Sequence, residues 1–167
     1  IIELNNDLAY IQVYEDTTGV GPGEPVTLTE RPLSVELGPG LLGSIYDGIQ
    51  RPLDVIRREH GDFVSRGIEM PALRRDKKWN FIPQKKTGDK LVSGDIIGYV
   101  QETPLIEHHI LVPAGVEGEI IDIKKGEFSV EEPVCRIKTQ AGSEEEIKLF
   151  QVWPVRRQRR VKERMMP

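Results

Sequence analysis

Glycine and proline interrupt this sequence more often than in an average soluble protein, and this limits what it can fold into. The chain has 167 residues, of which 16 are glycine and 12 are proline, whereas the two together usually make up roughly 12% of a chain. Both residues favour turns and break long helices. We therefore predict a mainly β fold built from short strands. Hydrophobic residues form 38% of the chain, which is enough for a packed core.

The patterns along the chain divide it into four predicted segments. These are strands over 1–37, a helical connection over 38–78, a second β region over 79–152 and a basic linker over 153–167. The first segment predicts strands over 8–14, 26–29 and 33–37, from β-branched and aromatic residues bounded by turns. The sequence opens on Ile1 in what reads as the middle of a strand. We therefore expect it to be a piece of a longer chain, with 1–37 packing weakly on the rest.

The connection is expected to contain two short helices. Apolar residues recur at helical spacing over 41–49, which predicts the first helix. The second helix is predicted to start at Arg51-Pro52, because proline is favoured at the first helical position. Gly61 is the expected cap at its C-terminal end.

The β region over 79–152 contains an internal similarity between residues 88–97 and 126–135. The matched pairs are Gly88 with Gly126, Asp89 with Glu127, Val92 with Val130, and Ile96 with Val134. Each copy reads as a turn, a short strand, a second turn and a second strand. Two such copies predict a small barrel or sandwich with approximate two-fold symmetry. The residues expected to share its core are Ile96, Val100, Val116, Ile120, Val134 and Ile137.

The sequence predicts no catalytic, cofactor-binding or metal-binding residue in the chain. It lacks Gly-x-x-x-x-Gly-Lys-Ser/Thr, the loop that cradles nucleotide phosphates. His108 and His109 are neighbours in a predicted strand, so their side chains point to opposite faces and do not share a metal. His60 lies on the predicted second helix. Cys135 is the only cysteine, and its apolar surroundings indicate a buried, unreactive thiol.

The charge is distributed unevenly between an acidic body and a basic end. The net charge is −4, yet the residues near the C-terminus carry a net positive charge. They include one acidic residue, Glu163, and six cationic residues: Arg156, Arg157, Arg159, Arg160, Lys162 and Arg164. Six cations allow a salt-sensitive contact with nucleic acid, so an independent nucleic-acid-binding β module is one alternative function. Few aromatic residues are available for base stacking, and the acidic body repels phosphate. We therefore expect no nucleic-acid partner.

Part of the second β region resembles the biotinyl and lipoyl carrier domains. The resemblance covers residues 94–103 and 110–120. Such domains present a modified lysine at a hairpin tip, which here reads Thr103-Pro104-Leu105-Ile106-Glu107. No lysine lies between Gln101 and Gly115, so the resemblance implies the fold without the chemistry. A carrier-like module remains the other alternative function.

A longer motif resembles the catalytic A subunit of archaeal A-type ATP synthases and vacuolar ATPases. The motif runs through residues 36–53, Glu-Leu-Gly-Pro-Gly-Leu-Leu-Gly-Ser-Ile-Tyr-Asp-Gly-Ile-Gln-Arg-Pro-Leu. Residues 11–25 are similar to the last strands of that family's N-terminal β-barrel. Trp153-Pro154-Val155-Arg156 is similar to the segment that leads into its nucleotide-binding domain. The resemblance identifies 79–152 as the family's non-homologous region, which bulges from the head of the enzyme.

The resemblance implies one function for the parent protein and a different one for this chain. The parent would couple ATP synthesis or hydrolysis to proton or sodium transport, with ATP or ADP and magnesium bound outside this chain. Its expected partners are peripheral stalk subunits and the B subunit. The complex would lie on the cytoplasmic face of the cell membrane, which the chain meets only indirectly. This chain would serve as a structural and subunit-contact module, inactive by itself.

Overall fold

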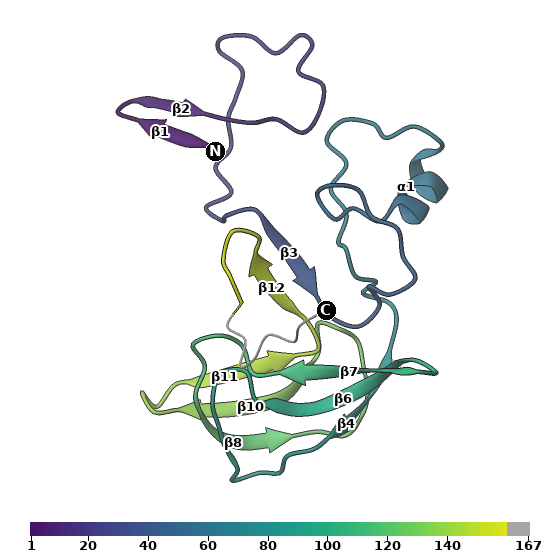
Figure 1. Cartoon of the computed structure of the whole chain (residues 1–167), viewed down its shortest axis with the longest axis vertical. Helices are drawn as coiled ribbons and strands as arrows, with labels where there is room; N and C mark the ends of the chain where they lie inside the picture. The colour runs from purple at the N-terminus through teal and green to yellow at the C-terminus, as the bar shows by residue number, and fades with distance from the viewer. Residues whose placement is uncertain (160–167) are drawn as a thin grey trace, which may run out of the picture.

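The computed structural model describes residues 1–159, which form a mainly β structure with one helix, α1 (Figure 1). The elements are β1 (Glu3–Asn5), β2 (Leu8–Tyr10), β3 (Ser34–Leu37), α1 (Leu53–His60), β4 (Trp79–Pro83), β5 (Lys90–Leu91), β6 (Ile96–Thr103), β7 (Ile106–Leu111), β8 (Gly118–Ile123), β9 (Gly126–Phe128), β10 (Pro133–Thr139), β11 (Glu144–Lys148) and β12 (Gln151–Pro154). The prediction of a mainly β fold is confirmed.

The N-terminal region is an exposed hairpin followed by a long loop. β1 and β2 pair antiparallel, and all their residues are exposed. The predicted strand over 8–14 ends at Tyr10, and 26–29 is not a strand. Among the described residues, no other strand pairs with this hairpin. This agrees with the expectation that the first segment packs weakly on the rest.

The connection holds one of its two predicted helices. α1 starts after Pro52 and ends where Gly61 N donates to Arg57 O at 3.1 Å, as expected. The predicted helix over 41–49 is wrong. Gly40, Gly43 and Gln50 all have positive φ angles, of 106°, 81° and 65°, a region that an L-residue in a right-handed helix does not occupy. These residues form turns instead.

Residues from β4 to β11 form a sandwich of two four-stranded sheets. One sheet has the order β7-β6-β4-β9 and the other β11-β10-β8-β5. The apolar side chains that face each other between the sheets make the core: Leu73, Trp79, Phe81, Leu91, Ile97, Val100, Ile110, Val112, Ile120, Val130, Val134, Cys135, Ile137, Ile147 and Leu149.

The two sheets are related by the predicted two-fold symmetry. β4, β5, β6 and β7 of the first copy correspond to β8, β9, β10 and β11 of the second. The short strand of each copy crosses to the other sheet, since β5 pairs with β8 and β9 pairs with β4. Each copy therefore completes the sheet of the other.

The structural equivalence differs by one residue from the alignment expected from the sequence. Asp95 accepts a hydrogen bond from Val92 N at 2.9 Å, and Glu132 accepts the matching bond from Ser129 N at 2.6 Å. By this register Ile97, and not Ile96, corresponds to Val134. Ile97 and Val134 are buried whereas Ile96 is only half-buried.

A β-bulge lies at the same place in both copies, between Ile96 and Gly98 and between Pro133 and Cys135, so it does not cause the shift. The alignment from the sequence was already one residue out before this strand, as the hydrogen bonds of Asp95 and Glu132 show. The remaining predicted core residues lie as expected, four of them buried and Val116 packed against the core at its margin.

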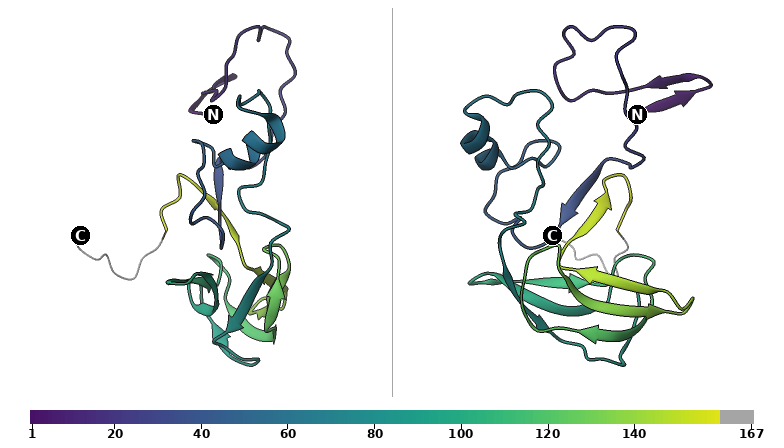
Figure 2. Two further views of the ribbon diagram at one scale, coloured as in Figure 1. Left: turned by 90° about the vertical axis from the view of Figure 1, so that its right-hand side faces the viewer. Right: turned by 180° about the vertical axis from the view of Figure 1, so that it is seen from behind.

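A separate two-stranded ribbon joins the sandwich to the N-terminal region. β3 and β12 pair antiparallel, with Ser34 opposite Pro154 and Leu37 opposite Gln151. Figure 2 shows this ribbon between the sandwich and the β1–β2 hairpin. The basic linker was predicted to begin at residue 153, but β12 continues to Pro154. Of that linker, Arg160, Lys162, Glu163 and Arg164 lie outside the described residues.

Candidate functional site

Three groups of charged side chains tie together the N-terminal region, the connection and the sandwich. Arg51 is the first centre of this junction. Its guanidinium donates to Asp47 Oδ2 at 2.7 Å, to Glu15 Oε1 at 2.9 Å and to the carbonyl of Ile68 at 3.1 Å. Because Arg51 presents a planar fork of donors, it holds three separate segments together.

Charge interactions shift the pKa values around Arg51. Burial by itself raises the pKa of Asp47, but the backbone N–H and guanidinium of Arg51 outweigh it and hold that pKa below its usual value. The N–H of Gly67 and the Arg51 guanidinium lower the pKa of Glu15. Both carboxylates are therefore ionised at neutral pH, and the cluster is ionic.

Glu36 on β3 is the second centre. Its carboxylate accepts a hydrogen bond from Leu73 N at 3.1 Å and pairs with Arg75. Arg75 also pairs with Glu131 of the sandwich at 3.0 Å and lies over the ring of Phe150 at 4.8 Å. β3, the end of the connection and the sandwich are thus tied through one guanidinium.

Glu102, near the end of β6, is the third centre. Only 3% of its side chain is exposed. Oε1 accepts hydrogen bonds from Gly40 N at 2.7 Å and Leu42 N at 3.1 Å, while Oε2 lies 3.1 Å from Nδ1 of His108. Burial lowers the pKa of His108, and the neighbouring Glu102 partly offsets this effect. The buried carboxylate fastens the turn over 38–42 to the sandwich.

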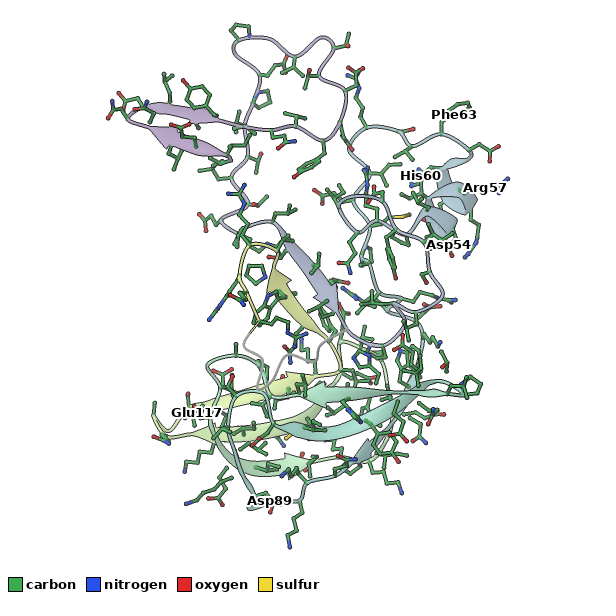
Figure 3. The ribbon with its side chains drawn as sticks, viewed as in Figure 1. Asp54, Arg57, His60, Phe63, Asp89 and Glu117 are labelled. Carbon is green, nitrogen blue, oxygen red and sulfur yellow. The ribbon has the colours of Figure 1, made fainter. Side chains whose placement is uncertain are left out.

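The histidines and the cysteine occupy the environments expected from the sequence. On β7, His108 is half-buried and His109 is exposed, so the two side chains do not converge. His60 lies on α1 beside Arg57 and Asp54, away from the sandwich (Figure 3). Cys135 is buried, and burial raises the pKa of its thiol to about 11.

Residues 1–159 contain no cluster of three or more His, Cys, Asp or Glu side chains placed to hold a metal ion. The expected absence of catalytic, cofactor and metal residues stays a prediction. No helix among the described residues has the length and apolar character needed to span a membrane.

Two family models match the chain, and they match the two β regions seen in the structure. The ATP synthase alpha/beta subunit barrel-sandwich domain matches residues 70–156, and the ATP synthase alpha/beta family β-barrel domain matches residues 1–30. The chain is 60% identical over its whole length to the A subunit of the A-type ATP synthase of Pyrococcus abyssi. The chain belongs to the family of A subunits of A-type and V-type ATP synthases.

Other members of this A-subunit family are nearly as similar. The A subunit of the A-type ATP synthase of Thermococcus sp. is 57% identical and the V-type ATP synthase alpha chain of Thermoanaerobacter sp. is 55% identical, each over the whole chain. The chain spans only 16% of the Pyrococcus protein, 29% of the Thermococcus protein and 28% of the Thermoanaerobacter protein.

The A-subunit motif of residues 36–53 is the part of the sequence that builds the junction. It contributes Glu36, Asp47 and Arg51, and also Gln50, whose side-chain amide exchanges two hydrogen bonds of 2.7 Å with the backbone of Glu36. The partners Arg75 and Glu102 lie outside the motif and were missed by sequence reasoning. No local pattern marks them, because each acts on residues far away in the chain.

The carrier-like hairpin has the expected position but a different tip. β6 and β7 are joined by a turn at Pro104 and Leu105. Leu105 is 95% exposed where a carrier domain would present its modified lysine. The alternative of an independent carrier module therefore gains no support from the tip.

Proposed function

We propose that this chain is the structural and subunit-contact part of the catalytic A subunit of a rotary ATPase. The whole subunit would make or hydrolyse ATP with bound magnesium, coupled to proton or sodium transport across the membrane. Its nucleotide site would lie outside this chain. The chain itself would form part of the interface with its neighbours, the peripheral stalk and the B subunit, at the cytoplasmic face of the membrane.

The observation that carries this proposal is the fastened junction between the two β regions. Glu15, Glu36 and Glu102 each tie a different part of the connection, and two of the three pair with an arginine. Charged hydrogen bonds of this kind are stronger and more directional than neutral ones. A module held in one orientation suits a contact role, because its surface is then presented at a constant position.

The proposal is tested in the full-length A subunit mixed with its B subunit. Glu102→Ala removes the buried acceptor and leaves two N–H groups unpaired. We expect the variant to bind MgATP as well as the unchanged protein does, but to assemble less completely with its partners in native mass spectrometry. Glu144→Ala, an exposed glutamate on β11, is the matched control and should assemble normally.

Two outcomes contradict the proposal. One is a full-length subunit that fails to bind MgATP even when unchanged. The other is normal assembly of the Glu102→Ala variant, with or without loss of nucleotide binding, because the junction would then have no part in subunit contact. The isolated chain should bind no MgATP at micromolar concentration in calorimetry, because it lacks a phosphate-binding loop.

A further inference from the structure

The polar contacts between the N-terminal region and the connection gather in one place, around Glu15. Every residue from 1 to 33 is exposed except Glu15, whose side chain is 30% exposed. The N-terminal hairpin and loop lie on the α1 side of the sandwich (Figure 2). Beyond them the chain enters β3, which pairs with β12. The position of residues 1–33 relative to the connection therefore depends on the contacts around Glu15.

Glu15 and Asp16 bind the connection through a group of charged hydrogen bonds, which we call the strap. Glu15 Oε1 accepts a hydrogen bond from Arg51 at 2.9 Å, and Oε2 accepts one from the N–H of Gly67 at 3.0 Å. Arg66 pairs with the carboxylate of Asp16 and donates to a backbone carbonyl of the same loop at 3.0 Å. The strap thus joins two loops that are about 50 residues apart in the chain.

The strap can open without leaving a buried charge unpaired. Arg66 and Asp16 are 53% and 61% exposed, so water can replace either as the partner of the other. Arg51 is more shielded, with 11% of its side chain exposed. When Glu15 leaves, however, Arg51 keeps its bonds to Asp47 and to a backbone carbonyl of the connection.

The tie between the connection and the sandwich is of a different kind. Glu102 is only 3% exposed, and separation would remove the hydrogen bonds that it accepts from Gly40 and Leu42. Loss of partners by a buried charged group is costly. Salt screens exposed charges strongly and buried ones much less. The two ties, which lie one after the other along the molecule, should therefore respond differently to salt.

We propose that the strap is a salt-sensitive latch. When it is closed, it holds the N-terminal region against the connection. When it is open, residues 1–33 pivot about Leu33, whose carbonyl accepts a hydrogen bond from Val155 N at 2.9 Å. The connection and the sandwich stay joined in both states. This inference goes beyond the proposed contact role, because it assigns a movement to the N-terminal region, and it holds whether or not the parent enzyme functions as proposed.

The test measures the distance between two spin labels in the chain by double electron–electron resonance. Tyr14→Cys with Leu105→Cys places one label beside the strap and one on the β6–β7 turn, both at exposed positions. Cys135 is buried, so we expect it to stay unlabelled. From about 0.01 M to about 1 M NaCl the Debye length falls from about 30 Å to about 3 Å, and the width of the distance distribution should increase at least about twofold. Ile45→Cys with Leu105→Cys, which joins the connection to the sandwich, should keep its width.

Three variants identify the groups responsible. Glu15→Ala should widen the distribution of the strap pair at low salt and remove its response to added salt. Arg66→Ala should act in the same direction, and it serves if Glu15→Ala does not fold. Arg58→Ala is the matched control, because it removes an exposed ion pair with Asp54 inside α1, at 3.6 Å. This variant should respond to salt as the unchanged chain does.

Three results overturn the proposal. The first is a strap pair whose distribution has the same width at both salt concentrations. The second is equal widening of both label pairs, which would mean that salt loosens the whole molecule. The third is a narrow distribution at low salt in both Glu15→Ala and Arg66→Ala, which would mean that other contacts hold the N-terminal region in place.

Discussion

Replacing Ile120 by alanine tests whether the core of the sandwich is the source of its stability. Ile120 lies in the middle of its sheet on β8, opposite Ile137, and is 1% exposed. The substitution removes three carbon atoms at about 0.8 kcal/mol each, which gives roughly 2.4 kcal/mol before any cavity is counted. Incomplete collapse of the surroundings adds about 24 cal/mol for each Å³ left empty. We expect the free energy of unfolding to fall by about 2–5 kcal/mol.

The assay is urea unfolding followed by tryptophan fluorescence, since Trp79 belongs to the same core as Ile120. Ile121→Ala is the control: it is the same substitution at the next residue, which faces the other way and is 39% exposed. We expect it to cost less than about 1 kcal/mol. A loss below about 0.5 kcal/mol for Ile120→Ala, or equal losses for the two variants, would refute the assignment of Ile120 to the core.

Three further predictions concern titration and local stability. The thiol of Cys135 is buried with its pKa raised to about 11, so it should resist iodoacetamide at pH 8 until the chain is unfolded; alkylation of the native chain at the rate of a free thiol would contradict this. Burial lowers the pKa of His108, so its contribution to stability is full above the usual value of about 6.5 and is lost as the pH falls below it. His108→Gln should therefore flatten the decline in unfolding free energy as the pH falls below about 6.5. An unchanged slope would contradict the burial effect. In hydrogen exchange, the amides of β2 should exchange much faster than those of β6, because every residue of β2 is exposed. Equal protection would mean that the hairpin is stably folded by itself, against this prediction.

The sequence predicted the sandwich well because its pattern is local and repeated. Turn residues and alternating apolar positions recur in both copies, so the strands and four of the six core residues follow directly. The register was predicted one residue away at Ile96, because the alignment matched Gly88 with Gly126, and these glycines do not occupy equivalent places in the two copies. The helix over 41–49 failed for a different reason. Its apolar spacing is helical, but Gly40 and Gly43 adopt positive φ angles that only the fold reveals.

The junction was the least predictable part of the molecule. Glu102 reads as one more polar residue near the end of a strand, yet it is almost completely buried and fastens a turn about 60 positions away. The same holds for Glu36 and Arg75, which pair across 39 positions. Long-range contacts of this kind depend on how the strands close into a sandwich, which is a property of the whole chain.

The β3–β12 ribbon determines how a mechanical load would pass through this chain. Ser34, where the chain enters β3, lies opposite Pro154, where it leaves β12. Tension applied between the residues before 34 and those after 154 therefore acts on two neighbouring strand ends, and it bypasses the sandwich between them. Such a load breaks the hydrogen bonds of the ribbon one after another, starting with the bond that Val155 N donates to Leu33 O. The sandwich would stay folded under a force that opens its own attachment.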